Sequence, residues 1–269
     1  MIRLAVFGHP VAHSRSPALH RAFAGQASVD LDYRAIECRA GALAEALADF
    51  AAAGGRGCNL TVPLKEEGAR LADRRSAAVS ISGAANTLVR DGDAWTADNT
   101  DGAGLVADLD RLGIDVSGRR VLVVGAGGAA AGVLPAVAAR GPAALHVVNR
   151  TAQRAEELAA RIQADDVALR GSGFEGIGDS GFEVILQATS LGHDGKVPPL
   201  DPAWLAGGAV AYDLNYGDAH GPFADWCAER GVACHDGIGM LVEQAALAFE
   251  RFTGFRPETG PVHEAMRRG

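Results

Sequence analysis

The chain has 269 residues, of which 48% are hydrophobic and 22% charged, and its formal net charge at pH 7 is −8. This length and composition are ordinary for a globular protein of one large or two modest domains. The acidic balance argues against a general nucleic-acid-binding surface, because neutralising phosphates requires clustered Lys and Arg. It does not exclude an anionic small-molecule substrate, since a few cations in one cleft outweigh a distant net charge.

Neither a membrane segment nor a targeting segment is indicated. No stretch reaches the roughly 18 uninterrupted apolar residues of a membrane helix, and the first eight residues lack the pattern of a signal peptide. The four cysteines (Cys38, Cys58, Cys227 and Cys234) are widely spaced and contain no C-x-x-C pair. Free thiols in a reducing compartment are therefore favoured over disulfides. We expect a cytoplasmic protein without a metal site, with no nucleic-acid or membrane partner, acting as a monomer or homodimer.

Short apolar runs alternate with Ala-rich amphipathic segments through the first hundred residues. The pattern predicts strands at 4–7, 33–37 and 57–62, and helices at 17–26, at 42–53 and from Pro63 onward. This βαβαβα order favours a mostly parallel sheet covered by helices. Residues 98–102 have turn chemistry and precede helical spacing at 103–112, so we place the crossing between two domains there.

A second β/α series follows, with predicted strands at 121–124, 145–148, 184–187 and 210–214. Apolar residues at helical spacing in 239–252 then predict a helix that returns to the first domain. We therefore expect an α/β fold of two domains. A mostly parallel N-terminal substrate domain comprises residues 1–101 with 238–269, and a Rossmann dinucleotide-binding domain comprises residues 102–237.

A dinucleotide-binding fingerprint opens the second series. Gly125-x-Gly127-x-x-Ala130 follows a predicted strand and begins a helix, which is the context that gives this pattern meaning. Gly125 permits the tight turn, Gly127 lets the backbone approach a pyrophosphate, and Ala130 lets the helix pack close to the sheet. The helix N-terminus then offers unpaired N–H groups to phosphate.

The end of the next predicted strand indicates which dinucleotide is bound. An NAD enzyme usually places Asp or Glu there, for the ribose 2′-hydroxyl. This chain instead has Asn149, Arg150 and Thr151, with Arg154 one helical turn later. A guanidinium can bind the oxygens of a 2′-phosphate bidentately and stack on adenine, whereas a carboxylate would repel that phosphate. NADP is therefore the predicted cofactor, against the alternative of ordinary surface arginines.

Two further segments are candidates from local sequence. In His13-Ser14-Arg15-Ser16-Pro17, Ser16 is placed as the N-cap of a helix with Pro17 in its first turn. Ser16 then either only caps, or joins Ser14 and exposed amides in a small carboxylate site. Lys65 lies in the first turn of another predicted helix, where a cation opposes the helix dipole. It is either a solvated surface residue or a proton donor for an oxidoreductase that works between two domains.

Taken together, the motifs resemble shikimate dehydrogenase from one end of the chain to the other. The resemblance is carried by GHPVAHSRSP at 8–17, NLTVPLKEE at 59–67, GAANT at 83–87, DNTDG at 98–102, the glycine turn at 125–129, Asn149-Arg150-Thr151, and DGIGML at 236–241. It implies the reversible, NADPH-dependent reduction of 3-dehydroshikimate to shikimate, a step of aromatic amino-acid (chorismate) biosynthesis.

The resemblance also implies roles for particular residues. Lys65 and Asp101 form the catalytic pair beside the reacting C3 oxygen. The resemblance gives the substrate carboxylate to Ser14 and Ser16. It gives the ring hydroxyls, or that same carboxylate, to Thr61, Asn86, Tyr216 and Gln244. The NADP site is lined by Gly125, Ala126, Gly127, Gly128, Ala129, Asn149, Arg150, Thr151, Arg154, Leu214 and Gly237.

Three positions depart from the family pattern, since Gln187 replaces a usual Asn, Ala131 a frequent Arg, and Ala77 an often acidic residue. None belongs to the proposed proton-transfer pair, so they bear on cofactor affinity more than on reaction type. Two alternatives stand beside this interpretation. One is a quinate/shikimate dehydrogenase of broader specificity that uses NAD, and the other is an NADP-binding regulatory module that has lost catalysis.

Overall fold

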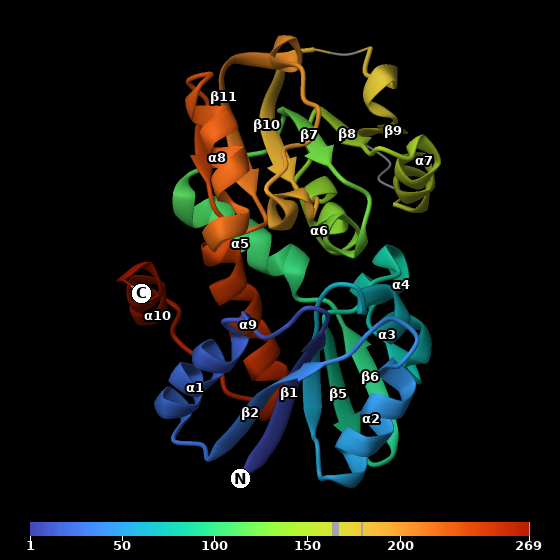
Figure 1. Ribbon diagram of the computed structural model, residues 1–269, viewed down its shortest axis with the longest axis vertical. Coiled ribbons are helices and arrows are strands. Elements are labelled where there is room, and N and C mark those ends of the chain that lie inside the picture. The colour runs from blue at the N-terminus through green and yellow to red at the C-terminus, as the bar shows by residue number, and fades with distance from the viewer. Residues whose placement is uncertain (163–166, 179, 269) are drawn as a thin grey trace. The chain divides into compact units, whose positions relative to one another are not determined.

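The computed structural model describes residues 1–162, 167–178 and 180–268 (Figure 1). The chain divides into two compact units, one formed by Met1–Leu105 with Leu241–Gly269 and the other by Val106–Met240. Both boundaries fall inside helices, because α5 spans Asp101–Leu112 and α9 spans Ile238–Thr253. Within the described residues, each unit contains one six-stranded sheet.

The first unit is built from strands and helices that alternate along the chain, completed by two C-terminal helices. Its other elements are β1 (Ile2–Gly8), α1 (Ser16–Ala27), β2 (Leu31–Glu37), α2 (Leu43–Ala52), β3 (Gly57–Leu60), α3 (Lys65–Leu71), β4 (Arg74–Arg75), α4 (Ala77–Ser82), β5 (Thr87–Asp91), β6 (Ala94–Asp98) and α10 (Gly260–Arg268). The strand order is β2-β1-β3-β5-β6-β4. β1 is parallel to β2 and to β3, whereas β5 is antiparallel to both β3 and β6.

The β5–β6 hairpin is the main feature of this sheet that the sequence-based prediction missed. Its two strands pair from Thr87 opposite Asp98 to Asp91 opposite Ala94. The two-residue loop between them begins at Gly92, whose φ of 60° suits the tight turns that join antiparallel strands. Because the hairpin reverses direction, the residues just before β5 and just after β6 lie at the same edge of the sheet.

The alternation of side chains in β1 explains how this sheet is covered on both faces. Ala5 and Phe7 belong to one cluster with Leu43 and Leu47 of α2. Leu4 and Val6 belong to another cluster on the opposite face, whose neighbours include Phe252 of α9. Figure 1 shows α2 and α3 on one side of the sheet and α1 with α9 on the other. The predicted return of a C-terminal helix is thereby confirmed.

Two local predictions were wrong in detail. The strand predicted at 57–62 ends at Leu60; the N–H of Thr61 still donates to the carbonyl of Phe7 in β1 (2.9 Å), and the chain then enters α3 at Lys65. The segment 98–102 is not a turn throughout, since α5 already begins at Asp101. Asp101 therefore occupies a helix first turn, where a carboxylate is favoured by the helix dipole.

The second unit has the strand arrangement expected of a dinucleotide-binding domain. Its elements besides the start of α9 are the later part of α5, then β7 (Arg120–Val124), α6 (Gly128–Ala138), β8 (Ala144–Val148), α7 (Ala152–Arg161), β9 (Ala168–Ser172), β10 (Phe182–Gln187), β11 (Leu205–Asp213), α8 (Gly221–Ala228) and β12 (Ala233–His235), with short 3-10 turns at Phe174–Gly176, Leu191–Asp194, Pro202–Trp204 and Gly217–Ala219. The strand order is β12-β11-β10-β7-β8-β9, and among the described residues neighbouring strands of this sheet are parallel.

This order places β7 and β10 side by side at the point where the winding of the sheet reverses, which is where open α/β sheets bind ligands. Val121 to Val124 of β7 are completely buried, as expected for a parallel strand that is covered on both faces. The predicted fold class is thus confirmed, although the prediction did not anticipate the outer strands β9 and β12. Among the described residues, no helix is long and apolar enough to cross a membrane.

His20 of α1 is a titratable group inside the first unit's core. Its ring stacks on that of Tyr33, with centroids 4.2 Å apart and planes 14° from parallel, and its side chain is completely buried. Burial lowers the pKa of His20 from 6.5 to about 3, because the imidazolium would lose its hydration. The imidazole is consequently neutral in the folded chain at neutral pH.

His20 predicts a specific loss of stability in acid. Its pKa is lower in the folded chain than in the unfolded one, so the unfolded chain binds the extra proton first as the pH falls below 6.5. From about pH 7 to about pH 4, this residue alone should reduce the free energy of unfolding by about 3 kcal/mol. We expect His20→Phe to make the free energy of unfolding, measured by urea titration at each pH, depend less steeply on pH. An unchanged pH dependence would contradict the assignment.

Candidate functional site

The first unit brings several predicted residues to one edge of its sheet. Thr61 follows the end of β3, Lys65 is the first residue of α3, and Asn86 directly precedes β5. Asp101 opens α5, three residues after the end of β6 at Asp98, with Asn99 and Thr100 between them. Since β5 and β6 pair with Thr87 opposite Asp98, Asn86 and the start of α5 are held close together.

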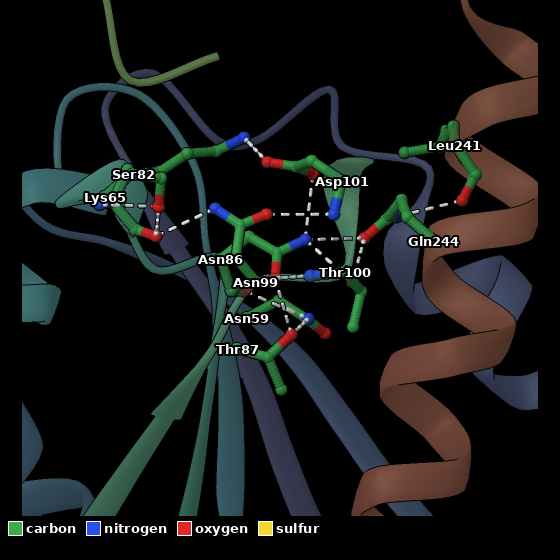
Figure 2. A network of polar contacts seen from close by, with 11 residues as sticks. Asn59, Lys65, Ser82, Asn86, Thr87, Asn99, Thr100, Asp101, Leu241 and Gln244 are labelled. Carbon is green, nitrogen blue, oxygen red and sulfur yellow. Dashed lines mark hydrogen bonds and ion pairs between the residues drawn. The ribbon is translucent and has the colours of Figure 1, made fainter. Parts of the chain in front are cut away.

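Lys65 and Asp101 form a short ion pair. Lys65 Nζ lies 2.5 Å from Asp101 Oδ2, and the two side chains are only 13% and 5% exposed. Asp101 is further held by its backbone N–H, which donates to Asn99 Oδ1 at 3.0 Å. Figure 2 shows this pair and the polar groups around it. An ammonium group that is poorly hydrated and paired with an oriented carboxylate is a suitable proton donor to a developing alkoxide.

Asn86 fixes the rotation of the Asp101 carboxylate. Its Nδ2 donates to Asp101 Oδ1 at 2.8 Å, so the two carboxylate oxygens are occupied by different donors. The amide cannot be flipped without loss, because Asn86 Oδ1 accepts the backbone N–H of Thr100 at 2.9 Å. Asn86 is 2% exposed, and its hydrogen bonds therefore form within the protein.

Gln244 of α9 joins the same network. Its Oε1 lies 3.2 Å from Asn86 Nδ2, and its Nε2 donates to the carbonyl of Leu241 at 2.9 Å (Figure 2). The approach of α9 depends on Gly104 of α5, where an added Cβ would lie 2.6 Å from the Cβ of Gln244. A side chain at Gly104 would therefore displace Gln244, which explains the glycine.

A second group of residues, which the sequence-based prediction missed, holds the backbone of Asn86 through hydrogen bonds from the strands of the sheet. Asn59 Nδ2 donates to the carbonyl of Asn86 and to Thr87 Oγ1, each at 3.1 Å. Tyr33 in turn donates its hydroxyl to Asn59 Oδ1 at 2.8 Å, and burial raises the pKa of Tyr33 so that it stays a donor. The available signal was Asn59 itself, a polar residue in the buried strand β3, which must find partners there.

The helix start at Ser14 and Ser16 differs from its prediction. Ser16 is not the N-cap of α1, because Arg15 occupies that position and its side chain makes no capping bond. Instead Ser14 Oγ accepts the backbone N–H of Ser16 at 3.3 Å, and Pro17 lies in the first turn as predicted. Ser16 is buried and Ser14 half-buried. The interpretation in which Ser16 only caps the helix was therefore wrong.

The glycine turn of the second unit has the geometry that its sequence predicts. Gly125 follows β7 with a φ of 113°, and an added Cβ would lie 3.1 Å from the backbone of Ala188. Gly127 is the N-cap of α6, and a Cβ there would meet no atom within 4 Å. Ala130 is completely buried, so α6 packs closely. The turn thus leaves open space in front of a helix N-terminus, as a bound phosphate requires.

The predicted adenosine end of the cofactor site follows β8. Asn149 donates its backbone N–H to the carbonyl of Ser172 at 3.1 Å and its Nδ2 to the carbonyl of Thr151 at 3.1 Å. Thr151 is the N-cap of α7, while Arg150 and Arg154 are exposed. This arrangement can present two guanidinium groups to a 2′-phosphate.

The remaining predicted residues lie in the loops after β11 and β12. Leu214 follows β11, Tyr216 is the N-cap residue of the 3-10 turn Gly217–Ala219, and Gly237 precedes α9. Tyr216 belongs to the second unit, whereas Lys65, Asp101 and the other predicted substrate residues belong to the first. Among the described residues, no group of three or more His, Cys, Asp or Glu side chains could hold a metal ion.

The three departures from the family pattern are accommodated differently. Gln187, at the end of β10, accepts the backbone N–H of Thr189 on its Oε1 at 2.8 Å and so shapes the following loop. Ala131 is buried within α6, which leaves no room there for a long charged side chain. Ala77 is the first residue of α4.

Models of one protein family match most of the chain. A shikimate dehydrogenase substrate binding domain matches residues 6–88, a shikimate / quinate 5-dehydrogenase model matches residues 108–175, and a shikimate 5'-dehydrogenase C-terminal domain matches residues 237–267.

Relatives and solved structures agree with these matches. The chain is 45% identical over 267 residues to the shikimate dehydrogenase (NADP(+)) of Chromohalobacter salexigens, covering 99% of this chain and 98% of that one. It is 46% identical to the corresponding protein of Dechloromonas aromatica, covering 97% and 96%. A crystal structure of shikimate 5-dehydrogenase from Thermus thermophilus in complex with NADP(H) and shikimate is 34% identical, with a TM-score of 0.87 and coverage of 100% and 99%.

Two glycine substitutions test the geometry of the phosphate-binding turn. Gly125→Ala should destabilise the chain by about 1–3 kcal/mol, because φ is positive there and the new Cβ would press on the backbone of Ala188. Gly127→Ala meets no atom and has an ordinary φ, so it should cost only about 1 kcal/mol or less, as a weaker N-cap. Denaturant unfolding of both variants measures the difference, and equal losses would contradict this account of Gly125.

Proposed function

The chain belongs to the shikimate dehydrogenase family, and we propose that it reduces 3-dehydroshikimate to shikimate reversibly with NADPH, using Lys65 as proton donor. In that family the reaction is a step of aromatic amino-acid biosynthesis. The observation that carries the residue assignment is the buried ion pair of Lys65 and Asp101, whose carboxylate is oriented by Asn86. A proton donor with a fixed partner is what carbonyl reduction requires of the protein.

Each member of the pair has one task in the proposed mechanism. Lys65 Nζ gives a proton to the C3 oxygen as the carbonyl becomes a hydroxyl, and takes it back in the oxidation direction. Asp101 keeps the ammonium aimed and accepts a hydrogen bond from the same hydroxyl. When bound, NADPH supplies a hydride from C4 of its nicotinamide. Holding the reacting groups in one geometry supplies much of the rate.

The substrate orientation follows from charge. The Lys65 ammonium is already neutralised by Asp101 at 2.5 Å, so a substrate carboxylate gains little from approaching it. We assign that carboxylate to Ser14 and Ser16, at the start of α1, where the helix dipole favours an anion. Thr61, Asn86, Gln244 and Tyr216 are assigned to the ring hydroxyls, with Asn86 and Gln244 exchanging one internal hydrogen bond for a substrate oxygen.

The cofactor residues are proposed on the fit of the second unit. Gly125, Ala126, Gly127, Gly128 and Ala129 would surround the pyrophosphate, because the turn is open at Gly127 and precedes a helix N-terminus. The adenosine end is assigned to Asn149, Arg150, Thr151 and Arg154, and the nicotinamide end to Leu214 and Gly237. The proposal also includes a cytoplasmic location, a monomer or homodimer, and no nucleic-acid or membrane partner.

The proton-donor role is tested with the chain's two lysines. Lys65→Ala should lower kcat by about a hundredfold or more, which is the usual effect of losing a general acid, with little change in shikimate affinity. Lys196 is the other lysine and is exposed, so Lys196→Ala serves as the matched control with wild-type kcat. Steady-state oxidation of shikimate by NADP measures both.

A Lys65→Ala variant that keeps more than about half of the wild-type kcat would exclude the catalytic role. A wild-type chain that binds NADPH but turns over neither shikimate nor 3-dehydroshikimate would instead support the regulatory-module alternative.

Cofactor preference is tested at Arg150. Hydrogen bonds to charged groups contribute about 1.5–3 kcal/mol each, enough for a tenfold or greater preference for NADP over NAD. We expect Arg150→Ala to weaken the binding of NADP and to leave the binding of NAD nearly unchanged. Because Arg150 is exposed, added salt should reduce the preference of the wild type for NADP over NAD. Arg119 precedes β7 at the opposite edge of the same sheet, so Arg119→Ala is the control.

Equal kcat/KM for NAD and NADP in the wild type would contradict this cofactor assignment. Comparable rates with quinate and shikimate in the same assay would then identify the broader quinate/shikimate dehydrogenase.

A further inference from the structure

A buried carboxylate that the proposed reaction does not use lies at the end of β11. Asp213 is completely buried, and its Oδ1 accepts both the backbone N–H of Asn215 (3.0 Å) and Asn215 Nδ2 (2.8 Å). Its Oδ2 lies 3.1 Å from Nδ1 of His220, whose side chain is 18% exposed. A buried charge is tolerated only when it is well paired. These three hydrogen-bonding contacts of the Asp213 carboxylate all go to residues between β11 and α8.

Asn215 connects that loop to its two neighbours. Its Nδ2 also donates to the carbonyl of Thr189, in the loop after β10, at 2.9 Å. Its own carbonyl accepts the backbone N–H of Gly237, in the loop after β12, at 2.9 Å. Asp213, by holding Asn215, therefore fixes three adjacent loops at the carboxyl ends of β10, β11 and β12.

These loops carry residues assigned to the cofactor and substrate. Leu214 and Tyr216 flank Asn215 directly, and the backbone N–H of Leu214 donates to the carbonyl of Gln187 at 2.8 Å. Gly237 packs so tightly that an added Cβ would lie 2.4 Å from the carbonyl oxygen of Leu214.

The loop after β10 also adjoins the phosphate-binding turn. At Gly125 an added Cβ would lie 3.1 Å from the Cγ2 of Thr189, whose carbonyl accepts the hydrogen bond from Asn215. A shift of Asn215 would therefore move a wall of the cofactor site.

We propose that Asp213, Asn215 and His220 are positioning residues that hold Leu214 and Gly237 in the conformation that binds the nicotinamide end of NADP. This inference rests on the proposed function, because it takes the cofactor site from it. Asp213 fixes the side chain of Asn215, and Asn215 in turn is hydrogen-bonded to the neighbouring loops. His220, at the start of α8, is the ionisable partner of the Asp213 carboxylate.

His220 makes this positioning sensitive to pH. Its hydrogen bond to Asp213 raises the pKa of His220, and the nearby charge of Asp236 acts in the same direction. The other titratable groups near Asp213 are the thiols of Cys227 and Cys234, and Arg230 lies near Cys227. The stabilisation from the His220–Asp213 pair is complete below the unfolded pKa of about 6.5 and is lost as the pH rises through the raised folded value. NADP should therefore bind less tightly in alkaline solution.

Titration calorimetry of NADP+ binding to the purified chain tests the proposal without requiring turnover. Asn215→Ala should raise the Kd by about fivefold to tenfold, the effect expected from losing one or two hydrogen bonds that order a binding loop. His220→Ala should weaken binding at neutral pH. His220→Asn keeps a neutral donor in the place of Nδ1, so it should retain most of the affinity while losing the alkaline weakening.

The control is Glu183→Gln, which removes a carboxylate that binds Arg119 and the N–H of Arg120 at the opposite end of the same sheet. It should leave the Kd for NADP+ unchanged. Thermal unfolding of every variant distinguishes a purely structural role from a positioning role. In a purely structural role, the melting temperature falls, but the Kd measured well below that temperature stays that of the wild type. That result for Asn215→Ala, or an identical pH dependence in wild type and His220→Asn, would overturn the proposal.

Calorimetry of NADP+ binding, combined with the shikimate oxidation assay, distinguishes failure of this proposal from failure of the proposed function. If the wild type binds NADP+ but does not oxidise shikimate, the proposed function fails while the variant affinities still decide the positioning role. If the wild type does not bind NADP+, both fail.

Discussion

The central interaction of the first unit is the ion pair between a mostly buried lysine and a buried aspartate. Removing two charges from water is costly, and that cost is offset only when the pair is close and its remaining atoms are hydrogen-bonded. Lys65 and Asp101 meet at 2.5 Å, and the second oxygen of Asp101 is bound by Asn86. Losing either partner would leave an uncompensated charge, so the surrounding loops are constrained to this one arrangement.

The architecture of the sheet serves that constraint. The β5–β6 hairpin places Asn86 beside the start of α5, and the polar side chains of Asn59 and Thr87 support Asn86 from the buried strands. A purely parallel sheet would send the chain away after β5, whereas the antiparallel pair returns it to the same edge. The antiparallel pair therefore brings Asn86 and Asp101 of the proposed site to one edge of the sheet.

Both helices through which the chain passes from one unit to the other carry residues of the proposed site. α5 begins with Asp101 and ends in the second unit, while α9 begins in the second unit and carries Gln244. The side chains of Asp101 and Gln244 are both hydrogen-bonded to Nδ2 of Asn86. Two residues of the proposed site thus lie on the helices that connect the two units.

Local patterns predicted most of this fold, whereas several candidates for its site, among them Asp101, Asn86 and Gln244, came only from the resemblance to a known family. The strands and helices of both β/α series, the glycine turn at Gly125 and the C-terminal helix follow from hydrophobic periodicity and turn chemistry. The β5–β6 hairpin was missed although Gly92 marks its turn, because short strands are ambiguous without their partners. Ser16 was misassigned as an N-cap because α1 already begins at Ser16, and the spacing of apolar residues does not fix the first residue of a helix.

The networks of Asn59, Asn86 and Asp213 could not be derived from spacing alone. Their partners are far apart in the chain, as with Tyr33 and Asn59 or Asn215 and Thr189, and meet only through tertiary packing. A polar residue inside an apolar strand indicates that partners exist, but it does not identify them.

The most direct test of the central claim is a crystal structure of the chain with bound shikimate. The account predicts that the C3 hydroxyl lies within hydrogen-bonding distance of Lys65 Nζ and the Asp101 carboxylate, with the substrate carboxylate at Ser14 and Ser16. A shikimate molecule bound with its carboxylate at Lys65, or with C3 remote from the Lys65–Asp101 pair, would contradict it.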